Sequence, residues 1–266
     1  MKKIVNNFIK YRFLLAELVK KGIKLRYRRS YLGILWTLLE PLLMMSVLTF
    51  IFGTLLGRHG DGGMYPVYPV YILCGRLCFS FFNSATTSCL KSIRKHSGMI
   101  KKVYVPKYLY PLSEVLYNYV IFLISLIVLI IVACIMKVFP SFTWLLTIVP
   151  LIQLFLLSFG VGMILATIGV FFRDMEYLWT VATTLIMYMS AIFYYPESLG
   201  ATAGDWKMKV IELNPLYGVI TNFRNCIFGH TLDWNLFAYT FIFSIVCIII
   251  GVFAFFKKQD KFILEI

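Results

Sequence analysis

The chain has 266 residues, of which 60% are hydrophobic and only 14% are charged. Soluble domains are roughly 45–50% apolar and about 25% charged, so this composition excludes a soluble protein and predicts an integral membrane protein. The net charge of +14 does not indicate nucleic-acid binding, because the basic residues cluster at the ends of apolar runs, where they would face anionic lipid headgroups.

Residues 1–30 are predicted to form an amphipathic helix at the cytoplasmic face of the membrane. Apolar side chains recur at three- and four-residue spacing from Ile4 to Ile23, and lysines and arginines lie between them. This pattern is typical of a helix that lies in the membrane interface. The first long apolar run begins after residue 30 and is too long for the core of a cleavable signal, so no leader is expected.

Residues 31–266 are predicted to form an all-α domain with six transmembrane helices. About 20 apolar residues cross a hydrocarbon core about 30 Å thick, and runs of this kind recur along the chain. They cover about 31–56, 69–90, 112–136, 142–171, 176–195 and 236–256. The fourth run contains Gly160, Gly162 and Gly169, which would allow another helix to approach closely.

The stretch 196–235 precedes the last run and is too polar and too interrupted to span the membrane. We expect two short helices here, broken at Asn214-Pro215, that dip into the outer leaflet as a re-entrant pair. Irregular backbone is tolerated at that depth only where protein or water covers it.

Basic residues are distributed unevenly between the connections of this layout. Twenty lysines and arginines fall on the side of the two termini, and five fall on the opposite side. Since positively charged connections stay in the cytoplasm, both termini are expected there.

The sequence lacks the motifs of an enzyme. It contains no GxxxxGK[ST] phosphate loop, no GxSxG, no HExxH and no carboxylate pair placed for acid–base catalysis. The three histidines lack metal-ligand spacing, and the six cysteines lie mostly inside apolar runs, as small apolar residues do. We therefore expect no catalytic residue, metal or cofactor on this chain, and transport would need an energy source on another chain.

Four stretches carry a resemblance to a known family. They are RYRRSYLGILWTLLEPLLMM at 26–45, HSGMIKKVYVPKYLYPLS at 96–113, GVFFRDMEYLW at 169–179 and LNPLYGVITNFRNCIFG at 213–229. Together and in this order they resemble the permease subunit of type-2 ATP-binding-cassette (ABC) exporters, most of all the polysaccharide, O-antigen and teichoic-acid group. One departure is CGRLCFSFF at 74–82, where the family usually has an apolar segment with Pro-Trp.

The resemblance implies an exporter in the bacterial plasma membrane. Two permeases would form a homodimer, and two P-loop ATPase subunits would bind it on the cytoplasmic side with ATP and Mg. The implied substrate is a glycan polymer linked to undecaprenyl diphosphate. The N-terminal helix would contribute to a cytoplasmic gate, and the broken pair of short helices would shape the outer exit.

The segment 91–108 is implied to couple the permease to the ATPase. Its six cations, with no acid among them, would suit an acidic cleft on a partner, although a cytoplasmic location alone would also account for them. The residues expected to carry the coupling are Lys95, His96, Met99, Ile100, Lys101, Lys102, Val103 and Tyr104.

Three arginines at the membrane surface are candidate ligands for the diphosphate. The planar guanidinium groups of Arg26, Arg28 and Arg29 could hold it with paired hydrogen bonds. The alternative is that they bind anionic lipid headgroups.

Aromatic residues make up 17% of the chain and are candidate channel-lining groups, because sugar rings stack on aromatic faces. The alternative is that most of them face lipid or form the interfacial belt. Glu40 joins them, because a carboxylate at mid-membrane costs about 2.5–3.5 kcal/mol and should face protein, water or a partner subunit, unless it reaches the interface. The expected channel-lining residues are Trp36, Glu40, Phe50, Tyr71, Phe79, Phe82, Tyr188, Phe193, Tyr194 and Tyr195.

Other functions remain open at this point. A permease of the same fold could expel small hydrophobic compounds, which a closed, purely apolar cavity would favour. A membrane enzyme acting on lipid-linked sugars would need clustered acids or histidines at one membrane face, and the sequence offers none. A non-catalytic scaffold would leave the aromatic and charge patterns unexplained.

Overall fold

The computed structural model describes residues 2–28, 30–55, 64–102, 105–138, 141–196 and 205–265. The predicted all-α class is confirmed, because this part of the chain contains helices and no β-strand. Arg29, Val103 and Tyr104, which the sequence singled out, lie outside the described residues.

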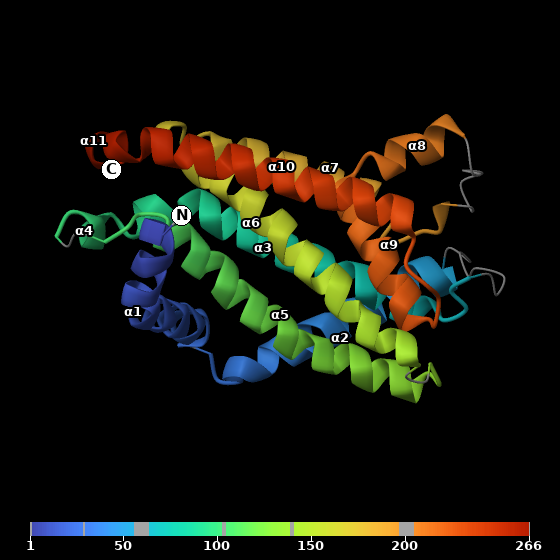
Figure 1. Ribbon diagram of the computed structural model, residues 1–266. Helices are drawn as coiled ribbons and strands as arrows, with labels where there is room; N and C mark the ends of the chain where they lie inside the picture. Colours follow the sequence, from blue (N-terminus) through green and yellow to red (C-terminus); the bar gives the residue numbers. More distant parts are fainter. Residues whose placement is uncertain are drawn as a thin grey trace.

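Eleven α-helices follow one another along the described residues (Figure 1). They are α1 (Lys2–Tyr27), α2 (Trp36–Leu48), α3 (Tyr68–Lys95), α4 (Ser97–Ile100), α5 (Leu109–Ile135), α6 (Ile148–Phe171), α7 (Met175–Met189), α8 (Trp206–Glu212), α9 (Pro215–Ile227), α10 (Trp234–Lys258) and α11 (Phe262–Glu265). Short 3₁₀ or π-helical turns extend α2, α6 and α10.

Four helical segments of the described chain are long and apolar enough to cross a membrane. They are Gly33–Leu55, Leu109–Ile135, Phe142–Phe171 and Trp234–Lys261. They match the predicted runs 31–56, 112–136, 142–171 and 236–256. The predicted runs 69–90 and 176–195 correspond to α3 and α7, which do not meet the same criteria of length and hydropathy.

Helix α3 forms the centre of the bundle, where it packs along α5 and α6. Eighteen of its 28 residues are buried. Neighbouring helices therefore satisfy polar groups that lipid could not, as where the Trp179 indole N–H donates to the Thr86 hydroxyl at 3.2 Å. Such a helix tolerates Ser, Thr and Asn, so its hydropathy falls below that of the lipid-facing helices.

Helix α7 starts beside the last turns of α3, and the residues after α7 reach the first turn of α3. Glu176 forms an ion pair with Lys91 of α3 at 2.9 Å. Beyond α7, the Tyr68 hydroxyl at the start of α3 donates to the Phe193 carbonyl at 2.6 Å. The segment formed by α7 and the residues up to Phe193 therefore runs beside α3 along nearly its full length.

Glycines bring α6 and α10 into close contact, as the sequence predicted for the fourth run. A Cβ atom on Gly160 would lie 2.9 Å from the backbone nitrogen of Ile248, and one on Gly251 would lie 2.9 Å from the Gly160 carbonyl oxygen. Gly162 meets Cys89 of α3 in the same way. Small residues at these positions let the backbones approach.

The two ends of the bundle are built from different elements (Figure 1). Both termini, α4 and α11 gather at one end, and α8 and α9 lie at the other. The predicted break between two short helices is confirmed at Asn214, whose side-chain oxygen caps α9 by accepting from the Leu216 N–H at 3.1 Å. Pro215 takes the first position of α9, which a proline favours.

Candidate functional site

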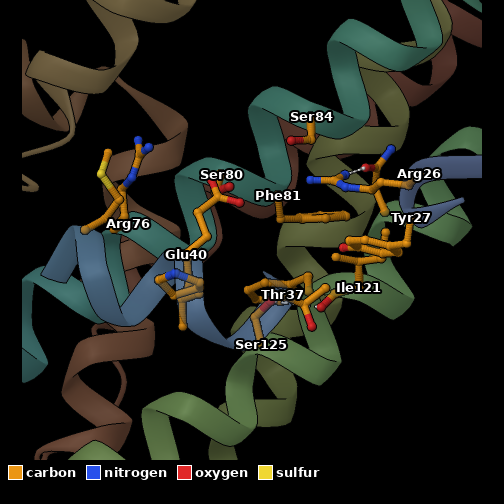
Figure 2. Close-up of a pocket in the computed structure, with 15 residues that line it drawn as sticks. Arg26, Tyr27, Thr37, Glu40, Arg76, Ser80, Phe81, Ser84, Ile121 and Ser125 are labelled. Carbon is orange, nitrogen blue, oxygen red and sulfur yellow. Dashed lines mark hydrogen bonds between the residues drawn. The ribbon is translucent and has the colours of Figure 1, made fainter. Parts of the chain in front are cut away.

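A polar cavity of about 50 Å³ lies between α1, α2, α3 and α5 (Figure 2). This volume is enough for about three water molecules. Its lining combines charged, hydroxyl and apolar side chains. They are Arg26, Tyr27, Thr37, Glu40, Pro41, Met44, Arg76, Leu77, Ser80, Phe81, Ser84, Asn118, Ile121, Phe122 and Ser125.

Helix α3 supplies one wall of the cavity through residues spaced by four. Arg76, Ser80 and Ser84 all line it, because positions four apart lie on the same helix face. Figure 2 shows Arg26 and Tyr27 at one end of the cavity and Arg76 at the other, with Glu40 and Ser80 between them. The cavity therefore follows this face of α3 for about 12 Å, the rise of eight helical residues.

Hydrogen bonds hold the Arg26 end of the cavity. The Arg26 guanidinium donates through Nη1 to the Asn118 side-chain oxygen at 3.3 Å. The Asn118 amide in turn donates to the Glu114 carbonyl at 2.8 Å and to the Ser88 hydroxyl at 3.3 Å. Burial raises the pKa of the neighbouring Tyr27 phenol, so Tyr27 lines the cavity as a neutral hydroxyl.

Charges at the other end lack such partners. Neither Arg76 nor Glu40 makes a hydrogen bond or ion pair with any residue that the structure describes, although Glu40 attracts Arg76 electrostatically. Two arginines and one carboxylate leave an excess of one positive charge along the lining.

The predicted diphosphate ligands divide between this cavity and its surroundings. Arg26 lines both the cavity and a second opening that it shares with Arg28. Both arginines are exposed at the end of α1. The structure thus places two of the three predicted guanidinium groups at one surface.

The predicted channel-lining aromatics fall into two groups. Tyr71, Phe79, Phe82 and Phe193 are buried in the core of the single chain. The exposed or half-buried members are Trp36, Phe50, Tyr188, Tyr194 and Tyr195. A channel wall between two copies must be accessible on each copy, so the second group has the placement that the prediction requires.

An open groove collects two of these aromatics. Tyr188 and Tyr194 line a depression of about 630 Å³ together with residues of α7 and α8. The Tyr194 hydroxyl donates to the Tyr188 carbonyl at 2.8 Å, which ties the bend after α7 to the helix itself.

Acidic residues of other helices lie beside part of the predicted coupling segment, although the segment itself contains no acid. Lys91 and Arg94 both contact Glu176 of α7, and Lys95 pairs with Glu114 of α5 at 2.8 Å. Met99 is half-buried on α4, and Ile100 anchors α4 in an apolar cluster with residues of six other helices. Lys101 and Lys102 are exposed and make no ion pair within the described chain.

His96 lies between α3 and α4. Its ring stacks on Tyr110 with the centroids 4.9 Å apart, and Nδ1 donates to the Ser92 carbonyl at 2.9 Å. Burial holds the pKa of His96 below its usual range, so the neutral ring is favoured.

Residues 14–228 match the family model described as ABC-2 type transporter. The chain belongs to this family. It is 29% identical over 94% of its length to 93% of the O-antigen export system permease protein RfbA of Klebsiella pneumoniae, and 27% identical to the protein of the same name from Myxococcus xanthus, over 87% and 86% of the two chains. The polysialic acid transport protein KpsM of Escherichia coli is 23% identical over 91% of each chain.

This ABC-2 transporter chain also holds a buried arginine whose role the sequence analysis missed. Arg224 of α9 is 1% exposed and donates to the carbonyls of Tyr71 and Ala191 at 3.2 and 3.1 Å. Its guanidinium lies 3.5 Å from the centre of the Tyr71 ring. In the sequence, Arg224 is only one of several polar residues in the stretch 196–235, and nothing local marks which of them turns inward.

The matched region of the ABC-2 chain includes every residue of the cavity. The sequence analysis named Glu40 as a candidate, included Arg76 only within the unusual segment 74–82, and missed the roles of Ser80, Ser84 and Asn118. The spacing Arg76-x₃-Ser80-x₃-Ser84 was the signal that could have indicated a polar helix face.

Proposed function

We propose that this chain is the membrane-spanning permease of an ATP-driven exporter of lipid-linked polysaccharide. The observation that carries the proposal is the similarity, over nearly the whole length of both chains, to permeases named for O-antigen export and polysialic acid transport. The chain itself would contribute the path through the membrane. ATP and Mg would bind to partner subunits.

Six spans follow from adding α3 and α7 to the four apolar segments. Helix α3 is about 42 Å long at 1.5 Å per residue, and it packs between two of those segments. The contacts of Glu176 and Phe193 with the two ends of α3 place α7 and the bend after it beside α3. With the excess of basic residues at the end of the termini, both termini would be cytoplasmic.

The working assembly would be two permeases with two P-loop ATPases. Closure of the ATPases around ATP would move α4 and the turn after it, and that motion would reach α3 and α7 through the Lys91 and Arg94 contacts with Glu176. The gate beside α1 would then open to the diphosphate end of an undecaprenyl-linked glycan, which Arg26, Arg28 and Arg29 would receive. The exposed aromatics, among them Tyr188 and Tyr194, would support the sliding sugar chain.

Reconstitution tests this proposal. The full chain, incorporated in vesicles with its partner ATPase, should move a lipid-linked glycan in a manner that requires ATP hydrolysis. The pair Lys101→Glu and Lys102→Glu should impair ATPase assembly and export, because both lysines are exposed at the expected docking face. Unchanged assembly and export in this variant would contradict the coupling assignment.

Efflux of small hydrophobic compounds is the second candidate, favoured by an apolar cavity of about 330 Å³. It lies between α3, α6, α7, α9 and α10, and Phe82, Trp179 and Phe243 line it. This volume is within the range of about 300–1,000 Å³ that small-molecule sites occupy. ATP-dependent transport of a fluorescent hydrophobic dye, with no transport of the glycan, would favour efflux.

A further inference from the structure

The diphosphate-binding role proposed for the arginines at the end of α1 does not include Arg76. This residue lies on α3 about 12 Å from the first residue of that helix and about 28 Å from the last, by helical rise. In the six-span layout this depth is within the hydrocarbon core, where an unpaired cation is costly and marks a functional site. Arg76 is partly exposed and lines the polar cavity.

The rest of the cavity supplies the other groups that bind phosphate oxygens. Ser80 and Ser84 follow Arg76 on the same face of α3, and neither hydroxyl makes a hydrogen bond with any residue that the structure describes. Thr37, Asn118 and Ser125 also line the cavity, but their hydrogens already go to the carbonyls of Ile34, Glu114 and Ile121 and to the Ser88 hydroxyl. Hydroxyl and guanidinium donors around a net positive charge are the usual environment of a phosphoryl group in proteins. Arg26 lies at the opposite end of the cavity, so each end of the cavity has a cation.

We infer that the cavity between α2 and the Arg76–Ser80–Ser84 face of α3 binds the phosphoryl group of a membrane lipid, with Arg76 as its inner cation. The inference rests on the proposed function in one respect, since a lipid-linked glycan carries such a group past this depth. The source of the phosphoryl group is either the lipid carrier of the glycan or an ordinary anionic phospholipid.

Substitution of Glu40 should change the affinity for the phosphoryl group in the direction opposite to substitution of Arg76. The Glu40 carboxylate lines the same cavity between the two arginines and is attracted to Arg76. It repels an incoming anion and competes for the guanidinium. Removing its charge should therefore strengthen phosphoryl binding, whereas removing the charge of Arg76 should weaken it.

The test measures lipid binding by the full chain in nanodiscs of phosphatidylcholine, without ATPase or transport. Native mass spectrometry would give apparent affinities for undecaprenyl diphosphate and, separately, for phosphatidylglycerol. Arg76→Gln should weaken binding by about tenfold or more, the factor that one charge-assisted hydrogen bond supplies. Glu40→Gln should strengthen it several-fold. Arg173→Gln, which changes an exposed arginine outside the cavity, should leave it unchanged.

Two further variants guard against a folding defect. Arg76→Lys keeps the charge and should retain most of the affinity, and Ser80→Ala with Ser84→Ala should weaken binding without removing a charge. Preference for undecaprenyl diphosphate would identify the carrier as the source, and equal affinity would identify phospholipid; both support the site.

The inference is overturned if Arg76→Gln weakens binding no more than Arg173→Gln does. It is also overturned if Glu40→Gln lowers thermal stability without strengthening binding, since Glu40 would then only stabilise the fold through its attraction to Arg76. Either result would leave ATP-dependent glycan export intact, because the assay contains no transport step.

Discussion

Arg224 joins three parts of the chain that are far apart in sequence. It projects from α9, and its guanidinium lies over the Tyr71 ring. It also donates to carbonyls of α3 and of the bend after α7. A Cβ atom on Gly75 would lie 2.5 Å from its Nη2, so only glycine leaves room for it there. This one side chain therefore fixes the position of the helix pair at the α8–α9 end.

Substitution of Arg224 should destabilise the whole chain. Arg224→Ala leaves a cavity and at least one buried carbonyl without its donor, which together cost about 3 kcal/mol. Arg224→Lys should restore little, because an ammonium cannot donate to both carbonyls and stack on Tyr71 as a planar guanidinium does. The midpoint of thermal unfolding in detergent measures the loss. Arg173→Ala is the control, and an equal midpoint for the two alanine variants would contradict the role assigned to Arg224.

His96 predicts a pH dependence of stability. Burial lowers its pKa in the folded chain below the unfolded value of about 6.5, so the unfolded state binds the extra proton. Stability should therefore fall as the pH drops through about 6.5 and recover above it. The Ser92 carbonyl and Glu114 oppose the effect of burial, while Lys95 and Lys21 reinforce it.

His96→Gln should flatten the pH dependence of stability. A neutral amide keeps a hydrogen-bond donor beside the Ser92 carbonyl but takes up no proton. Thermal unfolding of the full chain measured from pH 5 to pH 8 should show a smaller change for the variant than for the parent. Identical pH profiles would show that His96 protonation does not contribute.

At the scale of the elements, ion pairs tie the last turn of α3 to its neighbours. Glu176 of α7 pairs with Lys91 and contacts Arg94, and Glu114 of α5 pairs with Lys95. The sequence alone showed six cations and no acid, because the acids belong to other helices; Glu176 is 82 residues from Arg94. Periodicity and charge reveal what a helix presents, but they do not reveal its partner.

Glu176→Gln should uncouple transport more than it destabilises the fold. The side chains of this cluster are 21–50% exposed, so each pair contributes less than about 1 kcal/mol. If motion passes from α3 to α7 through these contacts, ATP-dependent export should fall several-fold while unfolding stays nearly unchanged. Glu17→Gln is the matched control, because Glu17 pairs with Lys20 inside α1 at 3.0 Å. Equal export by both variants would contradict the coupling role.

The sequence predicted those elements correctly whose structure depends on residues close together in the chain. Four spans follow from the hydropathy of single continuous segments, and the break at Asn214 follows from the N-cap residue and the proline after it. Both signals lie within one segment of the chain. Helix α3 escapes the hydropathy criterion because other helices, not lipid, surround it. The Arg224–Tyr71 contact spans 153 residues and depends on tertiary packing, which no local pattern encodes.

At the scale of the molecule, the bundle has two chemically different ends. The termini, α4 and the exposed Lys101 and Lys102 share one end, and α8 with Lys209 lies at the other (Figure 1). From the bias of basic residues we expect the first end to lie in the cytoplasm. This orientation would also determine which end can receive an ATPase.

Cysteine labelling should establish the orientation. In a Cys134→Ser background, which removes the exposed native thiol, a membrane-impermeant maleimide applied to cells stripped of any outer envelope should label Lys209→Cys. Lys101→Cys should react only after the membrane is opened, because its end of the bundle is expected to face inward. Both positions are exposed, so unequal reactivity in intact cells reflects sidedness and not burial. Labelling of Lys101→Cys from outside would invert the layout, and with it the docking face, the gate beside α1 and the direction of export.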